Sequence, residues 1–170
     1  MNQTANTDKI QRIVARQREY FRSGATRPVS ARIKALKMLR QEIKNREGIL
    51  LDVLKADLHK CPFEGYMCEV GLCLDELGYL IKNVSDWAKP QKRPTPLAQF
   101  KSKSYELPEP YGVTLVMSPW NYPILLSLDP VFGAVAAGNC VILKPSAYAP
   151  HTSRAMANLI AAVFDPGWVT

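Results

Sequence analysis

A chain of 170 residues with 47% apolar content is long enough for one globular domain and too short for two of ordinary size. This apolar content excludes a disordered protein, and no run approaches the roughly 18 consecutive apolar residues of a membrane-spanning helix. The polar start, residues 1–12, lacks the apolar core of a secretory signal, so a cytoplasmic protein is expected.

The net charge of +7 is concentrated early in the chain. Residues 1–60 hold 14 Lys and Arg against 6 Asp and Glu, whereas residues 61–170 hold 8 against 9. A basic half can bind nucleic acid, and a basic helical nucleic-acid binder is one hypothesis. We expect no such partner, because cations at spacings of three and four without interleaved aromatic rings are typical of a solvated helix face. These cations are Arg12, Arg16, Lys34, Lys37, Arg40 and Lys44.

The four cysteines, Cys61, Cys68, Cys73 and Cys140, show no spacing typical of a zinc site. The chain adds only two histidines as further soft ligands. We therefore expect no bound metal, no disulfide in a reducing compartment, and at least three thiols that are buried or on helix surfaces.

Apolar residues at helical spacing dominate the chain up to Trp87. They predict a helix over Thr7–Gly24, a second one that begins after Ser30 as its N-cap and breaks or bends near Gly48 before continuing, and a third over Glu64–Trp87. Pro90 follows the last of these helices.

Residues 90–110 hold five prolines and must be extended or looped. Within them the polar stretch FKSKSYEL, residues 100–107, could pair only as an exposed or edge strand. The composition changes sharply at Tyr111.

From Tyr111 the pattern is that of strand, helix, strand, helix. Val113–Met117 and Cys140–Leu143 are apolar runs typical of strands buried on both faces, and a third strand begins at Val169. Helices are predicted over Pro123–Ala137 and Pro150–Phe164. A βαβ unit of this length forces a parallel strand pair. The fold class is therefore α/β, with N-terminal helices plus the start of a Rossmann-like parallel βαβ sheet.

Asn121 and Lys144 lie just past the carboxyl ends of the two predicted strands. Ligands of open parallel sheets bind beyond these ends. A neutral amide can hold a developing oxyanion, and an ammonium group suits a phosphate or a ribose hydroxyl. The alternative is that Asn121 caps the helix opened by Pro123 and that Lys144 is a solvated loop residue, and spacing alone leaves both open.

Two blocks, PEPYGVTLVMSPWNYP and GAVAAGNCVILKPS, resemble the N-terminal part of the NAD(P)-dependent aldehyde dehydrogenases, and the flanking helices most resemble the shorter, class-3-like branch. The resemblance runs from about Thr7 to the end of the chain. It implies that Asn121 is the oxyanion-hole amide and that Lys144 hydrogen-bonds the adenosine ribose. The remaining residues implied to contact the cofactor, NAD or NADP, are Met117, Ser118, Pro119, Trp120 and Ser146.

The resemblance also implies a division of the chain. Residues 1–98 form a helical part of the cofactor domain, residues 99–110 a polar strand of the oligomerisation element, and residues 111–170 the first βαβα of the dinucleotide-binding domain. The catalytic domain is absent. An aldehyde substrate and a homodimer of the full-length form are implied.

Members of the family are more than twice this length and carry their nucleophilic cysteine and general-base glutamate later in the chain. None of the four cysteines here has a matching context. This chain alone is therefore expected to be inactive, because no thiolate can form the thiohemiacetal from which hydride leaves. The alternative is a non-catalytic remnant that binds nucleotide weakly or docks onto a full-length homologue.

Two further expectations follow. The family usually has a glutamate after Lys-Pro-Ser, where this chain has Ala147. Loss of a carboxylate that would repel a 2′-phosphate should favour NADP. A parallel sheet cut after its second or third strand also leaves unpaired edges, so the isolated chain should be poorly soluble.

Overall fold

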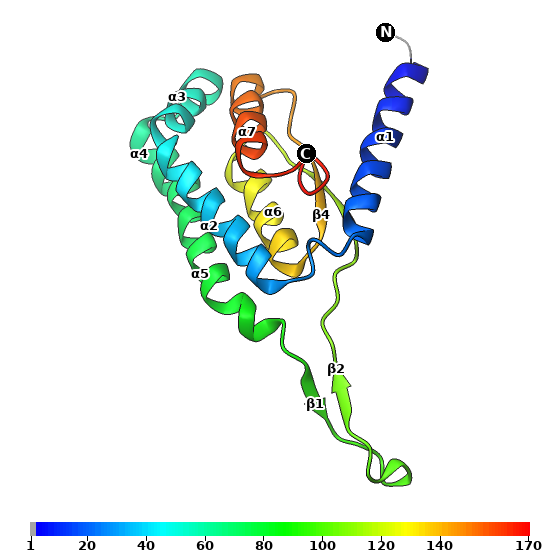
Figure 1. The fold of residues 1–170 in the computed structure, drawn as a ribbon. Coiled ribbons are helices and arrows are strands. Elements are labelled where there is room, and N and C mark those ends of the chain that lie inside the picture. The colour runs from blue at the N-terminus through cyan, green and yellow to red at the C-terminus, as the bar shows by residue number, and fades with distance from the viewer. Residues whose placement is uncertain (1–2) are drawn as a thin grey trace.

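Helices dominate the chain before Pro90, as the apolar spacing predicts. The computed structural model describes residues 3–170 and places α1 at Gln3–Arg22, α2 at Val29–Asn45 and α3 at Glu47–Leu58 (Figure 1). The short α4 at Pro62–Gly65 leads through a π-helical turn, η1 at Tyr66–Val70, into α5 at Gly71–Trp87. The helix predicted over Glu64–Trp87 is confirmed, with a π-helical turn near its start.

The predicted N-cap role of Ser30 is wrong. α2 begins at Val29, directly after Pro28, whose φ of −61° and ψ of 125° keep it extended. The Pro28 carbonyl accepts hydrogen bonds from the N–H groups of Ala31 and Arg32, so Ser30 lies inside the helix and cannot precede it. The break predicted near Gly48 falls at Arg46, between α2 and α3.

A small hairpin follows the helices and extends away from them (Figure 1). β1 at Gln91–Arg93 pairs antiparallel with β2 at Ser104–Glu106, and a 3₁₀ turn, η2 at Leu97–Gln99, lies in the connection. The side chains of both strands are largely exposed. The exposed strand predicted within FKSKSYEL is confirmed over Ser104–Glu106.

The last 60 residues form the predicted parallel unit. β3 at Val113–Met117, α6 at Leu125–Ala137, β4 at Cys140–Lys144 and α7 at Pro150–Val163 follow one another. β3 and β4 pair in parallel, with Met117 opposite Lys144. Val169 forms a parallel bridge to Val141, so the third strand also begins where the sequence predicts it. The α/β fold class is confirmed.

The core lies between the strands and a layer of helices. In Figure 1 the helices α2, α3, α5, α6 and α7 gather on one side of β4, and α1 stands on the other. Leu36, Leu77 and Phe132 are fully buried within this helical layer. Gln17 of α1 is also buried, and its Nε2 donates to the carbonyl of Val141 at 2.7 Å, which fixes α1 against β4.

Burial of β3 on both faces, as the apolar run predicts, is not observed. Val116 is buried against the helical layer, but Leu115 and Met117 keep 59% and 71% of their surface exposed. The reason is a cleft of about 930 Å³ between α1 and the strands, which leaves the second face of β3 only partly covered.

Candidate functional site

The carboxyl ends of β3 and β4 lie next to each other. Met117 pairs with Lys144, and the Ser118 N–H donates to the Lys144 carbonyl at 3.3 Å, which carries the pairing one residue further. The turn from β3 to α6 and the turn from β4 to α7 therefore leave the sheet at the same edge. The structure brings the turn that bears Asn121 beside Lys144, as the parallel topology predicts.

The Asn121 side chain is exposed, and its amide forms no hydrogen bond within residues 7–170, whose side chains the structure describes. Its backbone carbonyl instead accepts a hydrogen bond of 2.8 Å from Lys60 Nζ. The alternative that Asn121 caps α6 is wrong, because the Glu69 carboxylate accepts from the N–H groups of Ile124, at 2.7 Å, and Leu125, at 3.3 Å. The backbone of Asn121 is fixed, and its amide is free to bind a ligand.

Lys60 and Glu69 form a buried ion pair directly beneath this turn. Their Nζ and Oε1 atoms are 2.7 Å apart, and the side chains keep only 9% and 0% of their surface exposed. The Lys60 ammonium also lies 3.9 Å from the centre of the Tyr122 ring, within cation–π range.

Neither residue of this pair was predicted from the sequence, although one signal was present. Glu69 lies four residues before Cys73 and eight before Leu77, on the apolar stripe of a predicted helix. A carboxylate on a buried stripe needs a partner. Nothing in the sequence, however, identifies Lys60 or the β3–α6 turn as that partner.

The strand-end segment Met117–Trp120 divides into two kinds of residue. Met117, Pro119 and Trp120 are exposed. Ser118 is buried, and its hydroxyl lies 2.6 Å from the hydroxyl of Ser127 in α6. Ser118 therefore ties the strand end to α6, while its neighbours present their side chains to the surface.

The segment after β4 shows the same division. Lys144 and Ala147 are exposed, and Lys144 Nζ forms no hydrogen bond within the described residues. Ser146 is buried: its hydroxyl accepts from the Tyr148 N–H at 3.2 Å, and its carbonyl accepts from the Ser153 hydroxyl at 2.8 Å. Ser146 shapes the turn into α7.

A second carboxylate caps α7. Asp57 of α3 accepts hydrogen bonds from the N–H groups of His151 and Thr152, at 3.2 and 2.7 Å. Glu69 and Asp57 thus perform equivalent roles, each from the helical layer, at the two helices that follow β3 and β4. The first amides of both helices are already bonded inside the protein.

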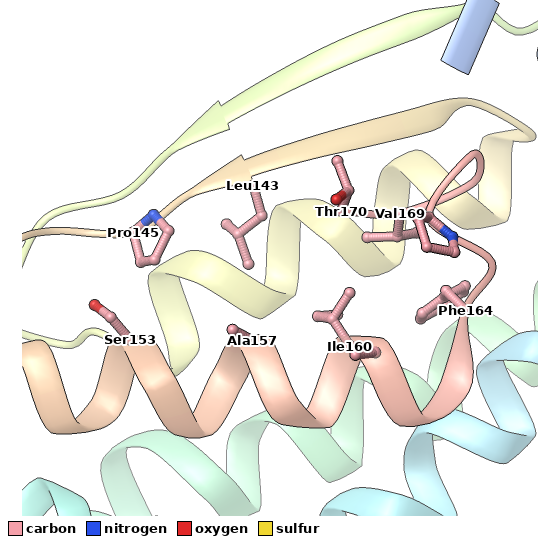
Figure 2. A pocket seen from close by; sticks show the side chains of 10 residues that line it. Leu143, Pro145, Ser153, Ala157, Ile160, Phe164, Val169 and Thr170 are labelled. Atoms are coloured by element: carbon pink, nitrogen blue, oxygen red, sulfur yellow. The ribbon is translucent and has the colours of Figure 1, made fainter. Parts of the chain in front are cut away.

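A small apolar pocket of about 150 Å³ lies between β4, α7 and the final strand. Figure 2 shows Leu143 and Pro145 facing Ala157 and Ile160 of α7 across it. The Ser153 hydroxyl at its edge is bonded to the Ser146 carbonyl. The residues predicted from the sequence to contact a cofactor do not line this pocket, whereas Met117 and Lys144 line the larger cleft beside α1.

Two of the cysteines are unsuited to nucleophilic chemistry. Burial raises the pKa of Cys140 to about 11 and raises the pKa of Cys73 far above its ordinary value, with smaller contributions from Asp129 and Glu69. Cys61 is exposed, and its Sγ accepts from the Glu64 N–H at the start of α4. Within residues 3–170, no three His, Cys, Asp or Glu side chains gather as a metal site requires. No described helix has the length and apolar character to cross a membrane.

Comparison with known proteins agrees with this geometry. The model of the aldehyde dehydrogenase family matches residues 2–170. The dimeric NADP-preferring aldehyde dehydrogenase of Canis lupus familiaris is 42% identical over 156 residues, which is 91% of this chain and 33% of the relative. Aldehyde dehydrogenase family 3 member B1 of Bos taurus is 38% identical over 158 residues, covering 93% of this chain and 33% of that protein.

A solved structure, the substrate-bound state of Staphylococcus aureus AldH, superposes with a TM-score of 0.92 at 36% identity. The superposition covers 94% of this chain and 35% of that one. The chain therefore spans about one third of the length of the relatives it matches. The match over residues 2–170 shows that this chain belongs to the aldehyde dehydrogenase family of NAD(P)-dependent oxidoreductases.

Proposed function

We propose that this chain is the N-terminal segment of a longer aldehyde dehydrogenase that oxidises an aldehyde to a carboxylic acid, and that Asn121 is its oxyanion donor. The observation that carries the proposal is the free amide of Asn121, on a turn whose backbone is bonded at both ends, beside the end of β4. A preorganised donor of this kind stabilises negative charge without rearranging.

In the proposed reaction a thiolate from outside this chain attacks the aldehyde carbon, and the carbonyl oxygen gains negative charge. The Asn121 amide donates an N–H to that oxygen and lowers the energy of the transition state. NAD or NADP, when bound, would accept the hydride that leaves the carbon, and hydrolysis of the thioester that remains would release the carboxylic acid and the thiolate.

The residues at the two strand ends fit a dinucleotide. Lys144 presents a free ammonium group, which suits a ribose hydroxyl, and Met117, Pro119 and Trp120 form an exposed, mainly apolar surface beside it. Ser118 and Ser146 act indirectly, because their hydrogen bonds hold the two turns in place. We propose a preference for NADP, because the exposed Ala147 carries no carboxylate to repel a 2′-phosphate. The 42% identical relative whose name describes it as NADP-preferring supports this proposal.

The hairpin of β1 and β2 fits the proposed role in oligomerisation. It extends from the helical layer, and Leu97, Phe100 and Leu107 expose 90%, 70% and 62% of their surfaces. Exposed apolar side chains on a protruding hairpin suit burial against another subunit. We propose that residues 99–110, together with β1 and η2 of the same hairpin, help to form a homodimer of the full-length enzyme, with the rest of residues 1–98 and residues 111–170 in the cofactor-binding domain.

The test is an aldehyde oxidation assay on the full-length enzyme obtained from the reading frame that encodes this chain. Asn121→Ala should lower kcat by about 100- to 1,000-fold, the usual effect of removing one oxyanion donor. Asn158→Ala, which removes an exposed amide on α7, is the matched control and should leave kcat unchanged.

The 170-residue chain, assayed alone with aldehyde and NADP, should show no turnover. An Asn121→Ala enzyme with full kcat would contradict the assignment of Asn121. Cysteine-dependent turnover by the 170-residue chain, or a frame that stops after Thr170 with no complementing segment, would contradict the proposal of a longer enzyme.

A further inference from the structure

The buried pair of Lys60 and Glu69 holds the turn that bears Asn121 at two points. Lys60 Nζ donates to the Asn121 carbonyl at 2.8 Å, and Glu69 Oε2 accepts from the Ile124 N–H at 2.7 Å. We propose that Lys60 and Glu69 are positioning residues for catalysis, which set the direction of the Asn121 amide by fixing the backbone on both sides of it. This inference rests on the proposed function of Asn121.

The hydrogen-bonding capacity of both groups is directed to this turn and to each other. The three contacts of the Lys60 ammonium are Glu69 Oε1 at 2.7 Å, the Asn121 carbonyl, and the face of the Tyr122 ring. The other oxygen of Glu69 accepts from the N–H groups of Ile124, just before α6, and Leu125, its first residue. The pair therefore connects the backbone of residue 121 to the backbone of residues 124 and 125. The connection runs through one hydrogen-bonded ion pair.

Stability alone is a weak reason for such a pair. Burying two charges is costly, and a buried ion pair can often be replaced by apolar residues of similar volume without loss of stability. Apolar replacements, however, cannot bond the Asn121 carbonyl or the α6 amides. Apolar residues could therefore preserve the stability of the fold, but only this pair fixes the geometry of the turn.

The ends of the turn are also held by other contacts, the hydrogen bond between Ser118 and Ser127 and the burial of Ile124. Between these ends, Asn121 and Tyr122 are exposed, and within the described residues the Asn121 carbonyl bonds to Lys60 and the Ile124 and Leu125 amides bond to Glu69. A misplacement of a catalytic group by about 1 Å can cost about 100-fold in rate. Release of the turn should therefore lower kcat.

The experiment compares three variants in the natural protein at its full encoded length: Glu69→Gln, the double variant Lys60→Met with Glu69→Leu, and the control Glu42→Gln. The control weakens a different ion pair, that of Glu42 with Arg46 at 2.6 Å, which lies far from any strand end in the sequence. Each variant is measured by amide hydrogen exchange at Ile124 and Leu125, by Tm, and by kcat and KM for aldehyde oxidation.

The double variant should keep its Tm within a few degrees. Its amide hydrogens at Ile124 and Leu125 should exchange faster by about tenfold or more. Its kcat should fall by about 10- to 100-fold, with little change in KM for NADP. Glu69→Gln should change exchange and kcat in the same direction. Glu42→Gln should change neither quantity. A purely structural role predicts a lower Tm with an unchanged kcat per active site.

Wild-type kcat in the double variant, or unchanged exchange at Ile124 and Leu125, would overturn the inference. The same series separates this failure from that of the proposed function. If Asn121→Ala lowers kcat and the double variant does not, only the positioning role fails. If Asn121→Ala has no effect, the proposed function fails, and the exchange rates still show whether the pair holds the turn.

Discussion

Ala147 shows how one residue can set the choice of cofactor. It follows Lys144, Pro145 and Ser146 on the turn into α7, and its side chain is exposed. The buried Ser146 fixes this turn through bonds to Tyr148 and Ser153, so a side chain at position 147 has a defined place beside the proposed ribose site. A carboxylate there would accept hydrogen bonds from ribose hydroxyls and repel a 2′-phosphate.

Ala147→Glu should therefore shift the ratio of NAD to NADP affinity towards NAD by about tenfold or more, because like charges close together near a protein surface repel by a few kcal/mol. Dissociation constants for both cofactors, measured by fluorescence titration of the full-length enzyme, would test this. Ala162→Glu, at an exposed site on α7, is the control. A strong preference for NAD in the unaltered enzyme would refute the role given to Ala147.

At the scale of elements, α6 is held at both ends by α2, η1 and β4. Its C-terminal end turns at Gly138, where φ is +92°. The Arg32 guanidinium of α2 packs against this turn and donates to the Ala136 carbonyl at 3.3 Å, and to the carbonyls of Thr26 and Arg27. A Cβ at position 138 would lie 2.8 Å from the guanidinium carbon.

Gly138→Ala should therefore lower the stability by about 1–3 kcal/mol, through left-handed backbone strain and displacement of Arg32. Gly133→Ala lies in the same helix with no atom within 4 Å of the added Cβ, and should raise stability by about 0.5–1 kcal/mol. Tm values of the two variants and of the unaltered protein, measured under matched conditions, test both predicted changes in stability. Equal Tm for the two variants would contradict the described packing of α6.

The sequence predicted these elements well where periodicity carried the information. The helix over Glu64–Trp87, the strand Val113–Met117 and the parallel pairing follow from apolar spacing and from the length of the connection. Ser30 failed as an N-cap, because the carbonyl of Pro28 accepts the first helical hydrogen bonds. The prediction that β3 is buried on both faces was wrong, because the burial of a strand depends on segments distant in the chain.

The candidate site was predictable only in part. Adjacent strand ends follow from topology, and they bring the turn of Asn121 beside Lys144. The roles of Lys60 and Glu69 were not predictable, because the contact of Lys60 with Asn121 joins residues 61 positions apart. No local pattern encodes such a contact. Glu69 carried a partial signal, as a charge on an apolar stripe.

At the scale of the whole molecule, the chain exposes large apolar side chains beside α1 and on the hairpin. Leu115 and Met117 face the cleft beside α1, and Tyr111 exposes 98% of its surface. The chain spans about one third of the length of its relatives. The uncovered face of β3 and the hairpin together give a large apolar surface, which favours association.

The isolated 170-residue chain should therefore associate in solution. Light scattering during size-exclusion chromatography should show species larger than the 19.0 kDa monomer that increase with protein concentration. Leu115→Lys with Met117→Lys should reduce this association, whereas Ala161→Lys, on an exposed site of α7, should not. A monodisperse monomer that unfolds cooperatively would contradict this expectation.

The most direct test of the central claim, that the chain supplies the oxyanion donor of an aldehyde dehydrogenase, is the rate of the first turnover. In a stopped-flow measurement on the full-length enzyme, the burst of reduced cofactor reports the chemical step before product release. Asn121→Ala should slow this burst by about 100-fold or more while the cofactor affinity stays the same. A burst of undiminished rate in Asn121→Ala, with the cofactor bound normally, would contradict the account.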